Sequence, residues 1–190
     1  MIEILSHWDT KTFFFLNSFN AGWLNPIMIF FSSQIIWVPL IAFFLFISFK
    51  EFPRNKFNLY IFFLILTLIA SDVTSSYILK NIFKRLRPCR EEDIKLLIYS
   101  FGQKCGGRFG FVSSHAANSF AILTFSFLML KKIKRIFHLL WIIPVLVSFS
   151  RIYLGVHFPG DLLGGAFIGI LWAVVFTQIL KRSKLWGQPT

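Results

Sequence analysis

Three short polar segments interrupt an otherwise apolar chain. The first runs over 80–88, the second over 112–115 and the third over 150–161. They contain two of the four histidines of the chain, several basic side chains and one aspartate. Because a charge inside or beside a bilayer costs several kcal/mol unless it is paired, hydrated or used, such clusters indicate a functional site. Histidines with fixed cations favour the chemistry of phosphate groups.

The first segment contains two basic residues at a helical spacing. Lys80 and Arg87 are seven residues apart, which is two helical turns, so both project from one face if the helix runs on to Pro88. Lys84 shares roughly this face. An ordinary helix end is the alternative, because basic groups in a last turn suit the helix dipole and can snorkel to water.

The second segment directly precedes a long apolar run. Ser113 and Ser114 can cap a helix there, and the first backbone N–H groups of a helix are free to bind an anion. His115 follows them. Taken alone, the segment favours a simple serine cap beside an incidental histidine.

The third segment joins two apolar runs. Arg151 ends the first of them, and Pro159 suits the first turn of the next helix. Asp161 in that turn can accept the imidazole N–H of His157, which fixes the tautomer and leaves the other ring nitrogen facing a substrate. The same two residue types also bind metals, but the neighbouring cationic side chains would repel a metal ion.

The composition indicates a multi-pass membrane protein. The chain has 190 residues, of which 56% are hydrophobic and 26 are Phe, and its mean hydropathy is +0.68. The formal net charge is +12, yet the basic residues lie at the ends of apolar runs. We therefore expect a membrane surface and an anionic substrate as partners, and no nucleic acid.

The apolar runs predict an all-α fold, a multi-pass membrane helix bundle. Residues 8–20 are short and partly polar, which favours an N-terminal interfacial helix, with a further span as the alternative; the bundle then has five to six transmembrane helices. No linker or repeat divides the chain, so 1–190 is expected to be a single membrane-embedded domain. Runs of about 20 apolar residues place spans near 26–49, 57–80, 113–130, 136–153 and 162–180.

With five spans, the three polar segments fall on one side of the membrane and the short basic links 50–56 and 131–135 on the other. Each side carries ten Lys and Arg residues. Dense charge in short loops follows the positive-inside rule most reliably, so we expect the polar segments to face outward. Cys89 and Cys105 share that side, where they can form a disulfide or remain free thiols.

The spacing of the three segments resembles the signature of the type 2 phosphatidic acid phosphatase superfamily. That signature reads Lys, six residues, Arg-Pro; then Pro-Ser-Gly-His; then Ser-Arg, five residues, His, three residues, Asp. The first and third motifs are matched in full over residues 80–161. The second differs at Val112, where the family has Pro, and at Ser114, where it has Gly.

The resemblance implies a metal-independent lipid phosphatase that needs no cofactor and works through a phosphohistidine. His157 would attack phosphorus, oriented by Asp161, and His115 would protonate the leaving oxygen and then help to activate water. From this resemblance together with the charge of the short links, we expect a bacterial inner membrane location with the active site facing the periplasm. The phosphate-binding residues would be Lys80, Arg87, Ser113, Ser114 and Arg151.

The segment 84–108 has more basic residues than one phosphate requires, which favours a multiply charged head group. The run 105–118 is similar to lipid A phosphatases of the superfamily, so lipid A phosphate is the first expectation, with undecaprenyl pyrophosphate or phosphatidylglycerol phosphate as alternatives. The head-group candidates are Lys84, Arg85, Arg90, Lys104 and Arg108.

Two further alternatives stay open from the residues themselves. An anion transporter would explain the basic cluster, but it leaves the pairing of His157 with Asp161 and a second histidine unexplained. Asp72 lies deep in an apolar span, where it either bonds to a neighbouring helix or, through Ser76 and Lys80 at successive helical turns, supports the site.

Overall fold

A computed structural model describes residues 2–98, 105–130 and 137–187 of the chain. Within these ranges the regular structure is helical and contains no β-strand, which confirms the all-α prediction. The longer helices are α1 (Ile2–Asn17), α2 (Asn25–Ser32), α3 (Trp37–Glu51), α4 (Arg54–Asp72), α6 (Ser114–Met129), α8 (Ile142–Tyr153) and α9 (Pro159–Arg182). The shorter ones are η1 (Gly22–Leu24), η2 (Gln34–Ile36), the π-helix η3 (Val73–Ile78), α5 (Leu79–Phe83), η4 (Pro88–Arg90), α7 (Phe137–Leu140) and α10 (Lys184–Gly187).

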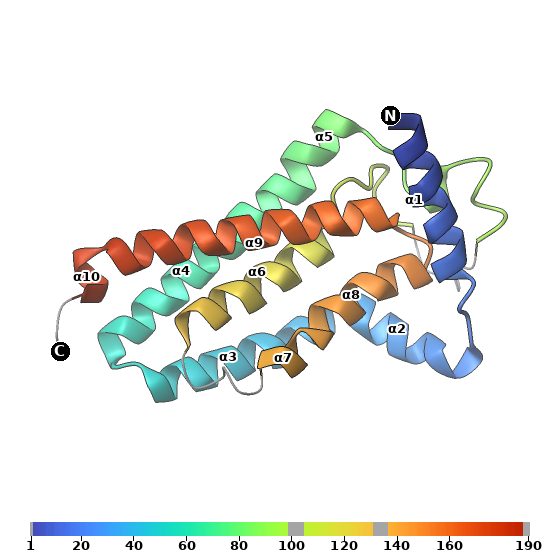
Figure 1. The fold of residues 1–190 in the computed structure, drawn as a ribbon. Helices are drawn as coiled ribbons and strands as arrows, with labels where there is room; N and C mark the ends of the chain where they lie inside the picture. The colour runs from blue at the N-terminus through green and yellow to red at the C-terminus, as the bar shows by residue number, and fades with distance from the viewer. Residues whose placement is uncertain (1, 99–104, 131–136, 188–190) are drawn as a thin grey trace.

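The helices α3, α4, α6, α8 and α9 lie side by side in an elongated bundle (Figure 1). The end of α5, the start of α6 and the turn between α8 and α9 lie at one end of it, together with α1. The turn between α3 and α4 lies at the opposite end, with α10. The bundle therefore gathers the three polar segments at one of its two ends.

Three helical stretches in the described part of the chain are long and apolar enough to cross a membrane. They are Gln34–Glu51, Arg54–Phe83 and Pro159–Arg182. The other two long helices of the bundle, α6 and α8, are shorter, with 16 and 12 residues. The number of membrane crossings stays a prediction.

The first predicted span, 26–49, is not one helix. α2 ends at Ser32, and Ser33 has an extended backbone with φ −80° and ψ 163°. The Ser33 hydroxyl accepts a hydrogen bond from the N–H of Ile35 at 3.3 Å. Serine side chains compete in this way with helical hydrogen bonds, so the chain restarts as η2 and α3.

The condition for Lys80 and Arg87 to share a helix face, that the helix runs on to Pro88, is not met. The helix ends at Phe83, and Lys84 adopts a left-handed conformation with φ 49°. Arg87 precedes a proline and is extended, with φ −81° and ψ 154°. Lys80 and Arg87 therefore do not share a helix face, and the loop after the helix decides where Arg87 lies.

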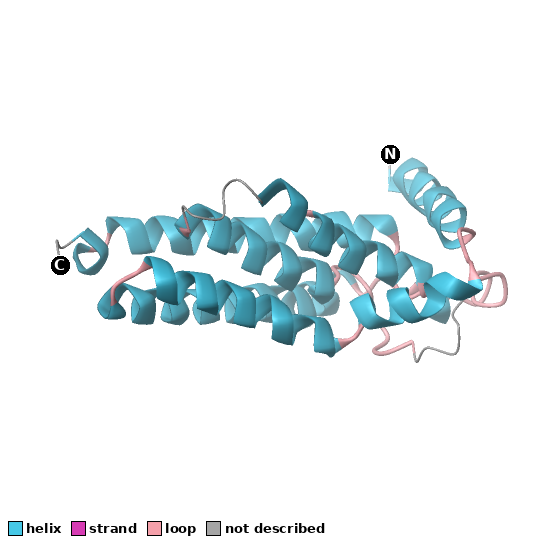
Figure 2. Ribbon diagram, turned by 90° about the horizontal axis from the view of Figure 1, so that it is seen from below, coloured by secondary structure: helices cyan, strands magenta, loops and turns pink. Residues whose placement is uncertain are grey.

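The α1 helix, predicted over 8–20, lies obliquely across the site end of the bundle (Figure 2). Phe13 is fully buried, and its ring meets that of Phe158 edge to face at 5.3 Å between centroids. The Asn17 amide donates to the backbone carbonyls of Ile152 and Tyr153, each at 3.0 Å. The α1 helix is thus docked on the turn between α8 and α9.

Glycines allow α6 and α9 to form the most extensive helix pair of the bundle. A Cβ atom on Gly165 would lie 2.4 Å from the carbonyl oxygen of Ser113, and one on Gly169 would lie 2.1 Å from that of Ala117. Small residues four apart permit such close backbone approach between membrane helices. This packing fixes the start of α9 against the start of α6.

We predict that Gly169→Ala destabilises the protein by about 1–3 kcal/mol, because its methyl group would force the two helix backbones apart. The measurement is the thermal midpoint of the purified protein in detergent. Gly22→Ala is the matched control, since no atom lies within 4 Å of a Cβ built there. Equal midpoints for the two variants would contradict the packing argument.

Candidate active site

The turn between α8 and α9 presents His157. Gly155 has a φ of 69°, which favours glycine, and this residue turns the chain at the end of α8. The backbone N–H groups of Val156 and His157 then both donate to the carbonyl of Arg151, at 3.0 and 3.3 Å. The His157 side chain is only 1% exposed, so its ring is held inside the bundle end.

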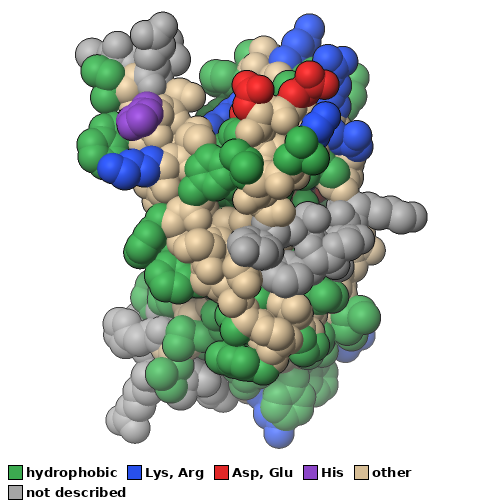
Figure 3. Space-filling model, turned by 90° about the vertical axis from the view of Figure 1, so that its right-hand side faces the viewer, with side chains coloured by type: hydrophobic (Ala, Val, Ile, Leu, Met, Phe, Trp, Pro, Cys, Tyr) green, Lys and Arg blue, Asp and Glu red, His purple; other side chains and the backbone are tan. Residues whose placement is uncertain are grey.

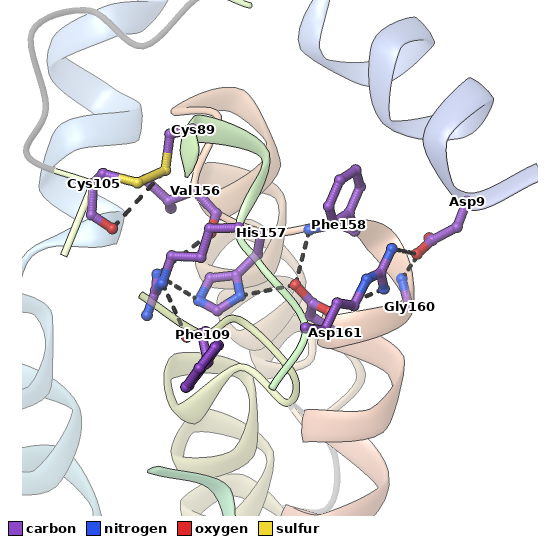
Figure 4. A network of polar contacts seen from close by, with 11 residues as sticks. Asp9, Cys89, Cys105, Phe109, Val156, His157, Phe158, Gly160 and Asp161 are labelled. Atoms are coloured by element: carbon purple, nitrogen blue, oxygen red, sulfur yellow. Dashed lines mark hydrogen bonds and ion pairs between the residues drawn. A yellow bond between two sulfur atoms is a disulfide. The ribbon is translucent and has the colours of Figure 1, made fainter. Parts of the chain in front are cut away.

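Asp161, in the first turn of α9, orients the His157 ring (Figure 4). Its Oδ2 atom accepts from Nδ1 of His157 at 3.2 Å and from the backbone N–H of Phe158 at 3.1 Å. The carboxylate is fully buried. Because Nδ1 must carry the proton in this contact, Nε2 keeps its lone pair.

Arg87 lies against that lone pair. Its Nη1 atom is 3.1 Å from Nε2 of His157 and donates to the carbonyl of Val156 at 3.3 Å. Its Nε atom donates to the carbonyl of Phe109 at 3.2 Å. Burial first, and then the positive charges of Arg87 and Arg151, hold the pKa of His157 well below its ordinary value of 6.5. A neutral imidazole whose Nε2 keeps its lone pair is what a nucleophile requires.

The remaining cations of the predicted site converge on the same place. Lys80 and Arg151 both lie within electrostatic range of His157. Arg151 donates through Nη1 to the carbonyl of Ser32 at 3.3 Å and also makes a close contact with the Ser32 hydroxyl. Its Nε atom is buried and has no partner in the described part of the chain. Ser32, which the sequence did not single out, thus holds Arg151 from α2.

The start of α6 forms the opposite wall of the site. Ser113 is fully buried, and its backbone N–H donates to the carbonyl of Asp161 at 2.9 Å. Its hydroxyl has no partner among the residues described. Buried polar groups are almost always hydrogen-bonded, so this unpartnered hydroxyl is available to bind an oxygen of a ligand. Ser114 begins the helix, and His115 lies within electrostatic range of His157 and Arg151.

Arg85 lies in a different position from the one we expected for a head-group residue. Its Nη1 atom is 3.1 Å from Oδ1 of Asp161, and its Nη2 atom is 2.6 Å from Oδ2 of Asp9. The left-handed turn at Lys84 directs the chain back toward α9. The guanidinium group of Arg85 is thus paired with two carboxylates, and its role at a head group stays a prediction.

The other head-group candidates lie farther out. Lys84, Arg90 and Arg108 are exposed, whereas Lys104 lies outside the described residues. Arg90 donates through Nη2 to the carbonyl of Gly106 at 3.0 Å. Basic and acidic side chains gather at this end of the molecule (Figure 3).

A disulfide joins Cys89 to Cys105, with 5.9 Å between their Cα atoms. Of the two alternatives for these cysteines, a disulfide or free thiols, the structure has the disulfide. The bond closes the loop that carries Arg90. Such bonds persist in oxidising compartments.

Asp72 at the end of α4 makes a hydrogen bond to a neighbouring helix, which was one of the two roles expected for it. Its Oδ1 atom accepts from the amide of Asn118 on α6 at 3.0 Å and from the Ser76 hydroxyl at 3.2 Å.

Within the described ranges, no three His, Cys, Asp or Glu side chains cluster in a way that could hold a metal ion. The site is instead built around cations.

Comparisons with known proteins show the family of this chain. Residues 59–185 match the PAP2 superfamily, and the chain belongs to this superfamily, which confirms the resemblance. It is 39% identical over 171 residues to a lipid A 4'-phosphatase of Bacteroides thetaiotaomicron, covering 89% of this chain and 75% of the relative. It is also 27% identical over 188 residues to a lipid A 4'-phosphatase of Porphyromonas gingivalis, covering 98% and 79%.

A solved structure shares the fold. The crystal structure of a transmembrane PAP2 type phosphatidylglycerolphosphate phosphatase from Bacillus subtilis superposes with a TM-score of 0.72 at 23% identity, covering 95% of this chain and 88% of that one. The chain is thus a membrane enzyme of the phosphoric monoester hydrolase class, a PAP2 lipid phosphatase.

We predict that activity extends to pH values at which an ordinary histidine is already protonated. Because the pKa of His157 is lowered, its neutral form persists below pH 6.5. The acidic limb of kcat/KM against pH, which reports groups of the free enzyme, should therefore lie below 6.5. A limb centred at or above that value would show that the nucleophile is not held in its neutral form.

Proposed function

We propose that this enzyme removes phosphate from a lipid head group through a phosphohistidine formed on His157. The observation that carries the proposal is the position of the His157 ring between Asp161 and Arg87. The contact with Asp161 keeps the proton on Nδ1, so Nε2 is the basic atom. The surrounding cations favour an anionic group at this atom. The whole chain, 1–190, is proposed to form one such catalytic domain.

In the first step Nε2 of His157 attacks phosphorus, and the bond from phosphorus to the lipid oxygen breaks. His115 donates a proton to that leaving oxygen. In the second step His115 takes a proton from water, which attacks the phosphohistidine, releases phosphate and regenerates the neutral imidazole of His157. The charge on the transferred group changes little between the steps, so fixed cations serve both.

Cationic groups and helix-start donors hold the oxygens of the transferred phosphoryl group. Arg87, which contacts Nε2 in the free enzyme, would donate to a phosphate oxygen instead when phosphorus approaches Nε2. In acyl-transfer enzymes one such donor contributes about 2.7–4 kcal/mol to the transition state. The proposed phosphate ligands are Lys80, Arg87, Ser113, Ser114 and Arg151.

The proposed substrate is lipid A phosphate. This choice is supported by the two relatives named as lipid A 4'-phosphatases and by the exposed basic residues around the disulfide loop. Lys84, Arg90, Lys104 and Arg108 would attract a multiply charged head group near the membrane surface. Undecaprenyl pyrophosphate and phosphatidylglycerol phosphate are the alternative substrates.

The proposed location is the inner membrane of a bacterium, with the site facing the periplasm. The disulfide between Cys89 and Cys105 supports this orientation, because it closes a loop at the same end as the site and suits an oxidising compartment. The short basic turn between α3 and α4 lies at the opposite end (Figure 1), as the positive-inside rule favours for the cytoplasm.

We predict that the purified protein releases phosphate from lipid A in the presence of a chelator. His157→Ala should abolish release, because the nucleophile is lost. His115→Ala should slow an alkyl phosphate far more than an aryl phosphate, by about 100-fold or more for the alkyl substrate, since only the basic alkoxide needs an acid. Phosphate release with both substrates at several pH values is the measurement.

An equal loss on alkyl and aryl substrates in the first step, measured as release of the alcohol or phenol within the first turnover, would contradict the acid role given to His115, because its action on water in the second step is common to both substrates. Loss of phosphate release in the chelator, followed by its restoration with zinc, would contradict a metal-independent reaction. Anion uptake into liposomes without any phosphate release would favour the transporter alternative.

The orientation predicts where an introduced cysteine can be labelled. In a variant with Cys89 and Cys105 replaced by Ser, Arg54→Cys should react with an impermeant maleimide only after the cytoplasmic side is opened, because Arg54 begins α4 at the end opposite the site. Glu92→Cys, an exposed position at the site end, is the matched control and should be labelled in intact cells. The reverse pattern would place hydrolysis on the cytoplasmic side.

A further inference from the structure

Arg85 joins the catalytic end of α9 to the N-terminal helix α1. One guanidinium nitrogen lies 3.1 Å from Oδ1 of Asp161, and another lies 2.6 Å from Oδ2 of Asp9. The side chain of Arg85 is 25% exposed, that of Asp9 is 14% exposed and that of Asp161 is buried. Arg85 therefore bridges two carboxylates from elements far apart in the sequence.

Asp9 also holds the first turn of α9 directly. Its Oδ1 atom accepts from the backbone N–H of Gly160 at 2.7 Å (Figure 4). A Cβ atom on Gly160 would lie 2.9 Å from the other oxygen of Asp9, so glycine permits this approach. The two oxygens of Asp9 thus bind two different groups, Gly160 and Arg85, which fixes the carboxylate in place.

The two oxygens of Asp161 are divided in the same way. Oδ2 accepts from His157 and from the backbone of Phe158, while Oδ1 faces Arg85. The Arg85 guanidinium also lies over the Phe158 ring, 4.2 Å from its centroid. Without Arg85 the buried carboxylate would lose its partner on Oδ1, and an unpaired buried charge is strongly destabilised.

We propose that Asp9 and Arg85 are positioning residues for the reaction at His157. They form a continuous chain of contacts, Asp9 to Arg85 to Asp161 to His157, in which neither touches the phosphate. Asp9 lies outside residues 59–185, the part that matches the PAP2 superfamily. The α1 helix, docked across the bundle end, therefore completes the catalytic apparatus. This inference rests on the proposed function of His157.

The proposal makes a kinetic distinction. A residue that reads the head group raises KM when it is neutralised, whereas a residue that orients the nucleophile lowers kcat with little change in KM. Misplacing a catalytic group by about 1 Å can cost about 100-fold in rate.

The test is steady-state kinetics of Arg85→Gln and Asp9→Asn on lipid A and on phosphatidic acid. We expect kcat of Arg85→Gln to fall about 100-fold, and that of Asp9→Asn less, on both substrates with KM nearly unchanged. The double variant should lose no more than Arg85→Gln alone, because the two residues act through one another. Arg85→Lys should recover only part of kcat, since an ammonium group cannot bridge two carboxylates in the same fork geometry.

Chemical rescue separates positioning from misfolding. Guanidinium ions, added below the concentration that unfolds the protein, should restore part of kcat to Arg85→Ala and none to His157→Ala. Glu92→Gln is the matched control, because it removes an exposed acid at the same end and should leave kcat unchanged. A variant that does not fold would show no rescue, and the Asp9→Asn variant then carries the test.

If Arg85→Gln raised KM for lipid A alone, with kcat unchanged, the proposal would be overturned. Arg85 would then be a residue that binds the head group. Additive losses in the double variant would also overturn the proposal, because Asp9 would then not act through Arg85. If His157→Ala keeps its activity, the proposed function fails instead. The two failures are therefore distinguishable.

Discussion

The carboxylate of Asp161 is buried at the end of a membrane bundle, and the site is arranged around its two oxygens. One oxygen accepts from His157 and from the backbone of Phe158, and the other faces Arg85. A buried carboxylate persists only when it is paired and hydrogen-bonded. The same contacts that stabilise Asp161 set the tautomer and direction of His157, so stability and chemistry depend on one group.

Two other features bring the remaining parts to this carboxylate. The close packing of α9 on α6, permitted by Gly165 and Gly169, holds the start of α6, with Ser113 and His115, against the first turns of α9. The loop after α5 delivers Arg87, because the helix ends early and the chain turns back. The bundle thus brings together cations that would repel one another unless an anion lay between them. This repulsion is the physical basis for the proposed phosphate site.

Much of the site could be predicted from the sequence because its parts are short motifs. The four-residue separation of His157 and Asp161 at a helix start is enough to predict their contact, and apolar runs are enough to predict an all-α bundle. The left-handed turn at Lys84 could not be predicted, so Arg85 was assigned to the head group. Asp9 could not be found either, since an acid on the N-terminal helix carries no signal in the sequence of its partner Arg85, 76 residues further along the chain.

The most direct test of the account is whether phosphate is transferred to His157. Purified enzyme would be mixed with lipid carrying a radiolabelled phosphate, quenched in alkali within the first turnover and digested for peptide mapping. The account predicts a label that is stable to alkali, labile to acid and located on the peptide containing His157. Phosphate released at full rate with no labelled protein at any time, or a label on another residue, would contradict it.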